Sequence, residues 1–277
     1  MTIKSSIAEA TPLSTSFWRS LFAERGVALP AADPLHCDAP VLRHAEIAAV
    51  YTGLRVAGDF YEFLRVSPSR MLFVLLDIAG LRADTRDILI AVQKTFRSLV
   101  PELFAGEDFN ETIAMSELCY AMNRTILDGG VRNCAAFIGC YNEDLGTLCY
   151  ANAGHTPGLL RDKTGITLLE ATGLPLGLFS HTTQSAGACH LLPGAALLAV
   201  SRGIIEASSS PAHSHDHETE FGLDGVRTAF QAAAVLGAHE ICLTTIEAAR
   251  KFTPTMLTHT IPTQNDRTAL ALVRNRL

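Results

Sequence analysis

The chain has 277 residues, of which 48% are hydrophobic and only 18% charged, with a net charge of −6 and a pI near 5.9. This composition is that of a globular protein with a large core, and the length suits one long domain better than two full ones. An acidic chain without basic runs is not typical of nucleic-acid-binding proteins, so nucleic acid is excluded as an expected partner.

The apolar segments are short, and none approaches the roughly 20 residues that span a bilayer. The first residues lack the apolar core of a signal peptide. Seven cysteines include no Cys-x-x-Cys pair, which favours free thiols in a reducing compartment over disulfides or a zinc site. We therefore expect a soluble, cytoplasmic protein without a membrane partner.

Residues 1–40 are predicted to hold one short helix and a tether. Apolar residues fall on one face of Ser14–Arg25, and Pro30, Pro34 and Pro40 follow. Such a helix can pack on its own domain or on a second chain, and the second arrangement would give a homodimer. Residues 41–277 are predicted to form the main domain.

A hairpin is predicted at the start of that domain. After a first strand, Ala45–Tyr51, come strands Phe60–Val66 and Met71–Leu76, with Asp59 before one and Asp77 after the other. The two aspartates are therefore expected at the same end of the sheet, where two carboxylates about 4 Å apart repel by roughly 4 kcal/mol at an effective dielectric of 20. They need a cation, a shared proton or separation, unless both simply cap turns.

The remaining elements fall into runs of one type. Apolar residues follow helical spacing at 88–99 and 113–126. The other predicted strands are Cys134–Tyr141, Thr147–Ala153, a short one near Leu159, Ile166–Leu169, Ala196–Ser201 and Thr268–Val273, and the other helices are Leu223–Ala233 and Ala238–Phe252. Because strands and helices segregate along the chain, we predict an α+β layered fold and not alternating βαβ units.

Two polar segments leave alternatives open. The stretch 213–217 alternates three histidines, which can bind a transition metal or can form a solvated loop. The turn 152–158 projects His155, which can act as an acid or base or can be a hydrogen-bonding residue that fixes the loop.

Eight short motifs occur in one order along the chain. They are Ala57-Gly58-Asp59-Phe60-Tyr61-Glu62-Phe63, Asp77-Ile78-Ala79-Gly80, Tyr150-Ala151-Asn152-Ala153-Gly154-His155, Gly173-Leu174-Pro175-Leu176-Gly177, Leu192-Pro193-Gly194, Ser201-Arg202-Gly203-Ile204-Ile205-Glu206-Ala207, Phe221-Gly222 and Asn265-Asp266-Arg267-Thr268. From about residue 45 to 277 this series closely resembles the bacterial PPM-type protein serine phosphatases of the SpoIIE class. The resemblance implies two packed antiparallel β-sheets flanked by helices, a binuclear Mn²⁺ or Mg²⁺ centre, and a phosphoserine substrate such as a phosphorylated anti-sigma-factor antagonist.

The resemblance assigns some of the metal ligands, whereas other ligand positions of the family hold different residues in this chain. Asp59 and Asp77 match two acidic ligands, and the backbone of Ile78 matches a carbonyl ligand. Arg202 and Asn265 stand where the family has two further aspartates, so these two positions are degenerate. The neighbouring Asp266 is the acid that could replace them.

The two lost aspartates change the charge of the site by three units. An ion about 5 Å from the guanidinium of Arg202 would be repelled by several kcal/mol even at an effective dielectric of 20. A normal binuclear centre is therefore not expected. Either Arg202 supplies the charge that compensates Asp59 and Asp77, or it turns out to solvent and the site is eroded.

Two functions follow from this pattern. The first is a pseudophosphatase without a metal cofactor, which binds a phosphoprotein and uses Arg202 as a bidentate phosphate clamp. The second is an active Mn²⁺- or Mg²⁺-dependent phosphoserine phosphatase in which Asp59, Asp77 and Asp266 hold the ion. The number of remaining acids favours the first.

Overall fold

The structure is a computed structural model that describes residues 37–53, 57–106, 109–131, 133–181, 184–209, 220–253 and 266–276. The predicted helix Ser14–Arg25, the histidine-rich segment 213–217 and Asn265 lie outside the described residues. Within the described part of the chain, no helix combines the length and apolar character needed to cross a membrane.

In the described residues, ten strands form two antiparallel sheets of five strands each, as the resemblance implied. The first sheet has the order β1-β10-β9-β6-β7, with β1 Ala45–Thr52, β10 Arg267–Arg274, β9 Ala196–Val200, β6 Gly158–Asp162 and β7 Gly165–Leu169. The second has the order β2-β3-β4-β5-β8, with β2 Ala57–Arg65, β3 Arg70–Leu81, β4 Cys134–Asn142, β5 Thr147–Ala153 and β8 Gly187–His190.

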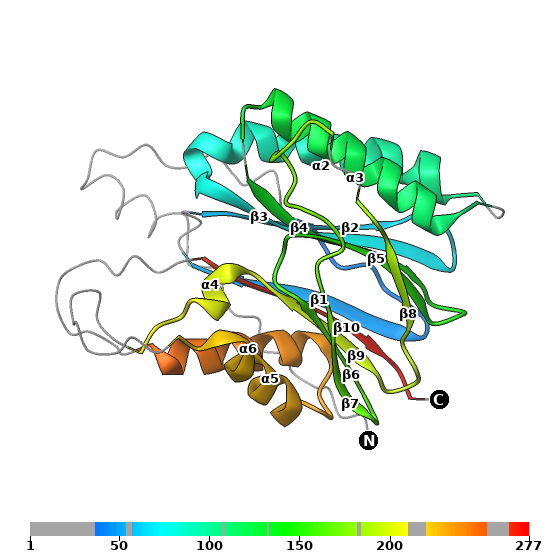
Figure 1. The fold of residues 1–277 in the computed structure, drawn as a ribbon. Helices are drawn as coiled ribbons and strands as arrows, with labels where there is room; N and C mark the ends of the chain where they lie inside the picture. The colour runs from blue at the N-terminus through cyan, green and yellow to red at the C-terminus, as the bar shows by residue number, and fades with distance from the viewer. Residues whose placement is uncertain are drawn as a thin grey trace, which may run out of the picture. The chain divides into compact units, whose positions relative to one another are not determined.

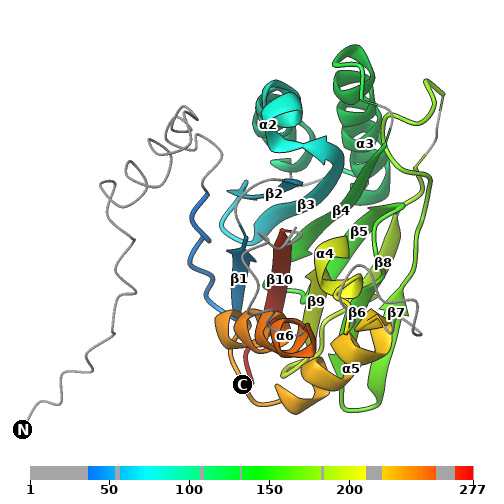
Figure 2. The same ribbon diagram turned by 90° about the vertical axis from the view of Figure 1, so that its left-hand side faces the viewer.

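Helices cover the outer face of each sheet (Figure 1). Helices α2 (Arg82–Phe104) and α3 (Glu111–Asp128) pack on the second sheet, while α5 (Gly222–Ala232) and α6 (Ala238–Phe252) lie over the first (Figure 2). The four-residue helix α4 (Arg202–Ile205) lies at one end of the two sheets. The α+β layered fold is therefore confirmed.

Apolar side chains on both faces of the central strands hold these layers together. The core between the sheets includes Phe73, Phe137 and Leu270, and a second core between the first sheet and its helices includes Leu198 and Phe230. Continuous apolar runs form strands here because both faces of each sheet are covered. All seven cysteines are free thiols.

The predicted elements that fall within the described residues were found, and two further elements were not predicted. The structure adds the short edge strand β8 and the helix α4. Strand β8 alternates half-buried and exposed residues over only four positions, and α4 is a single turn, so neither gives a clear periodic signal in the sequence.

Candidate functional site

Asp59 and Asp77 lie directly opposite each other on neighbouring strands. They are Cα partners in the antiparallel register of β2 and β3, and both residues are buried. The short turn between the two strands sets this register, as in hairpins generally. The prediction that the two acids meet at one end of the sheet is confirmed.

Gly58 and Ile78 form the irregular start of this strand pair. The register shifts between Ala57 and Gly58, as in a β-bulge. A Cβ atom at Gly58 would lie 2.5 Å from the carbonyl oxygen of Ile78, so only glycine lets the two backbones approach this closely.

Arg202 reaches Asp77 from the other sheet. It begins α4 directly after β9, and its Nε and Nη2 donate to Asp77 Oδ2 at 3.0 Å and to Oδ1 at 3.1 Å. The backbone N–H of Arg202 points at the same Oδ2, at 3.4 Å. The hydrogen bonds and charge of Asp77 raise the pKa of Arg202, so the guanidinium remains charged. Of the two alternatives for Arg202, the structure has the ion pair.

The ion pair is exposed on one side only. The side chain of Arg202 is 47% exposed, whereas that of Asp77 is 8% exposed. Glu206 acts on Arg202 through its charge, but the partner that Arg202 hydrogen-bonds is Asp77. The guanidinium is therefore fixed by a buried carboxylate and faces solvent on its far edge.

Asp59 is in a less favourable environment for a charged group. Burial and the charge of Asp77 raise its pKa to about 7, against the opposing effect of hydrogen bonds from Thr268 and Ser201. The Thr268 hydroxyl donates to Asp59 Oδ2 at 2.7 Å. Near neutral pH this carboxyl group is therefore close to half protonated when no cation is bound.

Ser201 and Thr268 continue the pairing of β9 with β10 in the first sheet, and Thr268 reaches Asp59 on the second sheet. The backbone N–H of Thr268 donates to the Ser201 hydroxyl at 3.0 Å, and the backbone N–H of Ser201 donates to the carbonyl of Thr268 at 2.9 Å. This pairing fixes the start of α4, and hence Arg202, opposite Asp77. The sequence analysis gave neither residue a role, although both lie inside quoted motifs.

Asp266 belongs to the cluster, whereas Arg267 does not. Asp266 is buried, its charge contributes to the raised pKa of Asp59, and it packs against Gly53. Arg267 turns away and donates to the carbonyl of Gly203 at 3.3 Å and to the Thr253 hydroxyl at 3.0 Å. Among the described residues, three buried acids and one arginine are therefore grouped at this end of the sheets.

His155 lies beside this group. Burial lowers its pKa, the hydrogen bond with Thr156 and the charge of Asp77 oppose that shift, and the charge of Arg202 adds to it. The loop itself is fixed by Asn152, whose Oδ1 accepts from the His155 backbone N–H at 2.8 Å and whose Nδ2 donates to the carbonyls of Thr156 and Leu169. Asn152 therefore fixes the loop, and the His155 ring contributes a hydrogen bond between its Nδ1 and the Thr156 carbonyl, at 3.1 Å.

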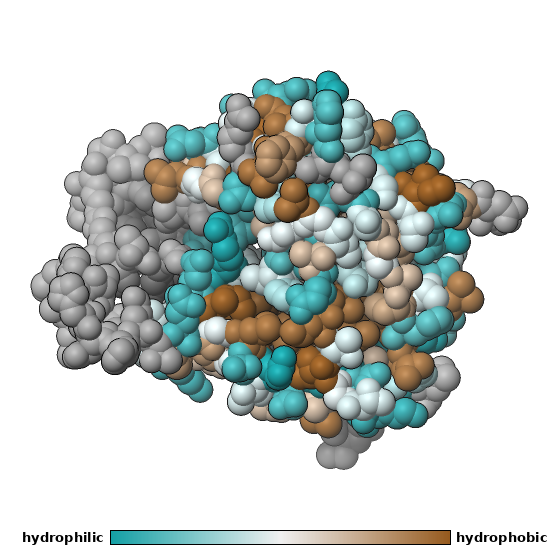
Figure 3. Space-filling view, in the orientation of Figure 1, coloured by the Kyte–Doolittle hydropathy of each residue, from teal (hydrophilic) through white to brown (hydrophobic). Residues whose placement is uncertain are grey.

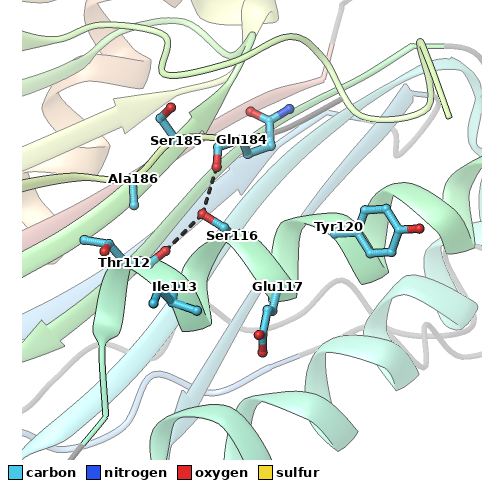
Figure 4. Close-up of a pocket in the computed structure, with 8 residues that line it drawn as sticks. All are labelled: Thr112, Ile113, Ser116, Glu117, Tyr120, Gln184, Ser185 and Ala186. Carbon is cyan, nitrogen blue, oxygen red and sulfur yellow. Dashed lines mark hydrogen bonds between the residues drawn. The ribbon is translucent and has the colours of Figure 1, made fainter. Parts of the chain in front are cut away.

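Among the described residues, no group of three or more histidine, cysteine, aspartate or glutamate side chains could hold a metal ion. The larger described hollow, about 580 Å³, lies away from the acid cluster, between α3 and the segment before β8 (Figure 4). Ser116 there donates to the carbonyls of Thr112 and Gln184, at 3.0 and 2.8 Å.

Comparison with protein families gives one match over most of the chain. The model of the family described as Stage II sporulation protein E (SpoIIE) matches residues 67–275, about three quarters of the sequence. Protein IcfG of Synechocystis sp. is 24% identical over 197 residues, which are 61% of this chain and 30% of IcfG. The chain therefore spans less than a third of the length of that relative.

Solved structures share the fold at low sequence identity. The RsbU and RsbW domains of Rv1364c from Mycobacterium tuberculosis match with a TM-score of 0.67 and 22% identity, over 86% of this chain and 63% of that one. The PP2C phosphatase domain of SpoIIE from Bacillus subtilis, with a fragment of its regulatory domain, matches with a TM-score of 0.64 and 16% identity, over 84% and 64%. At these identities the matches establish the fold.

Proposed function

The chain belongs to the SpoIIE family, and from this premise we propose that it is a catalytically impaired PPM-type phosphatase domain that recognises a phosphoprotein without hydrolysing it. The observation that carries the proposal is the ion pair of Arg202 with Asp77. A guanidinium that engages both oxygens of a carboxylate leaves it poorly available to a metal ion.

The chemistry of the remaining donors supports the same proposal. A two-metal centre needs several carboxylates, because hard divalent cations prefer oxygen ligands whose charge offsets their own. Here the fixed positive charge of Arg202 lies where the family has an acid, and the described residues include no group of three that could hold a metal. These residues do not fit a binuclear Mn²⁺ or Mg²⁺ centre.

One observation favours a second candidate, an active metal-dependent phosphoserine phosphatase acting on a regulatory phosphoprotein such as an anti-sigma-factor antagonist. Asp59, Asp77 and Asp266 are all buried at the same end of the sheets, and Asp59 is affected by the charges of the other two. Buried acids that repel one another are typical of sites that bind a cation. In this candidate a single Mn²⁺ or Mg²⁺ displaces Arg202.

The hydrolysis of a generic aryl phosphate distinguishes the two candidates. We expect no turnover by the whole chain with Mn²⁺ or Mg²⁺, and a gain of turnover in the Arg202→Asp/Asn265→Asp double variant, which restores both family acids. Adding Asp77→Asn to the double variant should remove the gain, which controls for contaminating phosphatases. Metal-dependent turnover by the native chain that is lost in Asp77→Asn would instead establish the active enzyme.

The proposal also covers the setting of the domain. We place the protein in the cytoplasm, with residues 41–277 as the recognition domain and residues 1–40 as a helix and tether that pack on the domain or on a second chain. Sedimentation of the whole chain, compared with a Trp18→Asp variant, tests the second arrangement. A dimer that the variant converts to a monomer would support it, and a monomeric native chain would contradict it.

A further inference from the structure

The hydrogen bonds of Arg202 leave one edge of its guanidinium unused. An arginine has five N–H donors in a planar fork. Nε and one hydrogen of Nη2 are directed at Asp77, and the described residues provide no acceptor for the other three. Two of those three, one on Nη1 and one on Nη2, are parallel and point away from Asp77.

Parallel N–H donors at this spacing match two oxygens of a phosphate or carboxylate. Asp59, Asp77 and Asp266 are buried, whereas Arg202 is 47% exposed, so the outer edge of the guanidinium is open to an incoming anion. The exposed Glu206 also acts on Arg202 through its charge and makes no hydrogen bond to the guanidinium. Asp77 fixes the plane of the fork without contacting the ligand, which makes it a positioning residue.

A surface segment with a fixed backbone lies near the ion pair of Arg202 and Asp77. Residues 172–178, which we call the flap, are anchored at several points. The Leu176 backbone exchanges hydrogen bonds of 2.8 and 2.9 Å with Cys134, and the Gly177 N–H donates to Asn123 Oδ1 at 2.7 Å. On either side of these anchors, Leu174 is 49% and Leu178 is 37% exposed. The backbone of the flap is fixed while its two leucines remain in contact with solvent.

Contacts connect the flap to the ion pair. Pro175 packs against Gly154, where a Cβ atom would lie 2.4 Å from the proline ring. The flap residue Leu176 pairs with Cys134, which is the Cα partner of Ile78 on β3, the residue after Asp77. Hydrophobic side chains lie among hydrophilic ones on this face of the molecule (Figure 3).

We propose that a serine-phosphorylated segment of a partner protein binds here, with its phosphate on the outer edge of Arg202 and an apolar residue near the phosphoserine on Leu174 and Leu178. The inference rests on the proposed function and names the chemistry of the partner. The phosphate provides charge complementarity, and the flap selects among phosphoproteins.

A peptide library with a central phosphoserine and randomised flanking positions tests the proposal, beside the same library with serine. The native chain should retain phosphopeptides preferentially and enrich one flanking position in apolar residues. Arg202→Lys keeps the charge but loses the fork, and should reduce the preference for phosphate by roughly tenfold. Leu174→Ser/Leu178→Ser should keep the phosphate preference and lose the apolar selection. Val235→Ser, an exposed apolar residue before α6, should change neither.

The outcomes separate the inference from the function on which it rests. If the native chain prefers phosphopeptides but Arg202→Lys and Arg202→Ala bind them equally well, the Arg202 site is wrong and the proposed function stands. Apolar selection that survives in the double leucine variant overturns the role of the flap. If the native chain does not distinguish the two libraries, the proposed function and the inference both fail. Thermal melting of each variant confirms that a lost preference reflects a folded protein.

Discussion

Each end of the β-sheets buries a carboxylate beside arginine, but the hydrogen-bond donors around that carboxylate differ between the two ends. At the end where β2 turns into β3, Glu143 accepts from the backbone N–H groups of Arg43 and His44, at 2.6 and 3.1 Å, and from the side chains of Arg43 and Arg65. At the other end, Asp59 and Asp77 share a single arginine among the described residues. Both ends therefore contain buried carboxylates and arginine, but the Glu143 end has more donors for its carboxylate.

The pKa values reflect that difference. Burial opposes ionisation of Glu143, yet hydrogen bonds from His44, Arg43 and Arg65 hold its pKa below the ordinary value. Burial and the charge of Asp77 instead raise the pKa of Asp59 to about 7. The Glu143 end is arranged for stability, whereas the Asp59 end retains unfavourable charge of the kind found at functional sites.

The largest expected effect is at the Glu143 end. Glu143→Gln removes the charge that several donors share, and we expect a loss of about 3 kcal/mol in the free energy of unfolding at pH 7. Because the folded-state pKa lies below the unfolded one, this contribution is present above the unfolded pKa and is lost as the pH falls through the folded value. Chemical denaturation at pH 7 and at pH 3 measures both. An equal loss at the two pH values would contradict the account.

Arg202→Ala should have a smaller but clear effect. It leaves Asp77 buried and without its ion pair, which would cost 3–5 kcal/mol in a fully buried site. Because Arg202 is half-exposed, we expect about 2 kcal/mol at neutral pH, measured by denaturation in the presence of EDTA. An unchanged midpoint would mean that the ion pair contributes nothing, and that the two ends do not differ as described.

Asp59→Asn should stabilise the protein. The raised pKa means that folded Asp59 holds a proton between about pH 4 and pH 7 that the unfolded chain lacks. Its contribution to stability is therefore present at low pH and lost as the pH rises through about 7. We expect Asp59→Asn to gain about 1 to 2 kcal/mol at pH 8 and almost nothing at pH 4, in thermal melts without metal. A destabilised variant at pH 8 would show that Asp59 is satisfied as a charged group.

The smallest expected effect is that of a surface ion pair used as a control. Glu247 and Arg250 pair on the exposed face of α6, with side chains 48% and 59% exposed. Glu247→Gln should change the stability by less than about 0.5 kcal/mol. A change as large as that of Arg202→Ala would mean that removing any charge from this acidic chain alters its stability.

Much of the fold could be predicted because strand periodicity is a local signal. The hairpin placed Asp59 and Asp77 together correctly, since the turn between the strands sets their register. The contacts across the sheets could not be predicted in this way. Arg202 is 125 residues from Asp77 in sequence, and Thr268 is 209 residues from Asp59, so no local pattern indicates either contact.

The resemblance to a family supplied part of what periodicity could not. It located Arg202 near the two acids, although it left open whether the side chain pairs with them. It gave no role to Thr268 or Ser201, and Glu143 lies in none of the motifs that carry the resemblance. The number of donors around a buried carboxylate depends on packing in three dimensions, so the sequence did not reveal how the two ends differ.

Calorimetric titration of the purified chain with Mn²⁺ tests the central claim most directly, because Arg202 and a metal ion compete for Asp77. We predict no measurable binding by the native chain and binding by the Arg202→Asp/Asn265→Asp variant. Tight binding of Mn²⁺ by the native chain would contradict the account and would mean that the remaining acids complete a metal site despite Arg202.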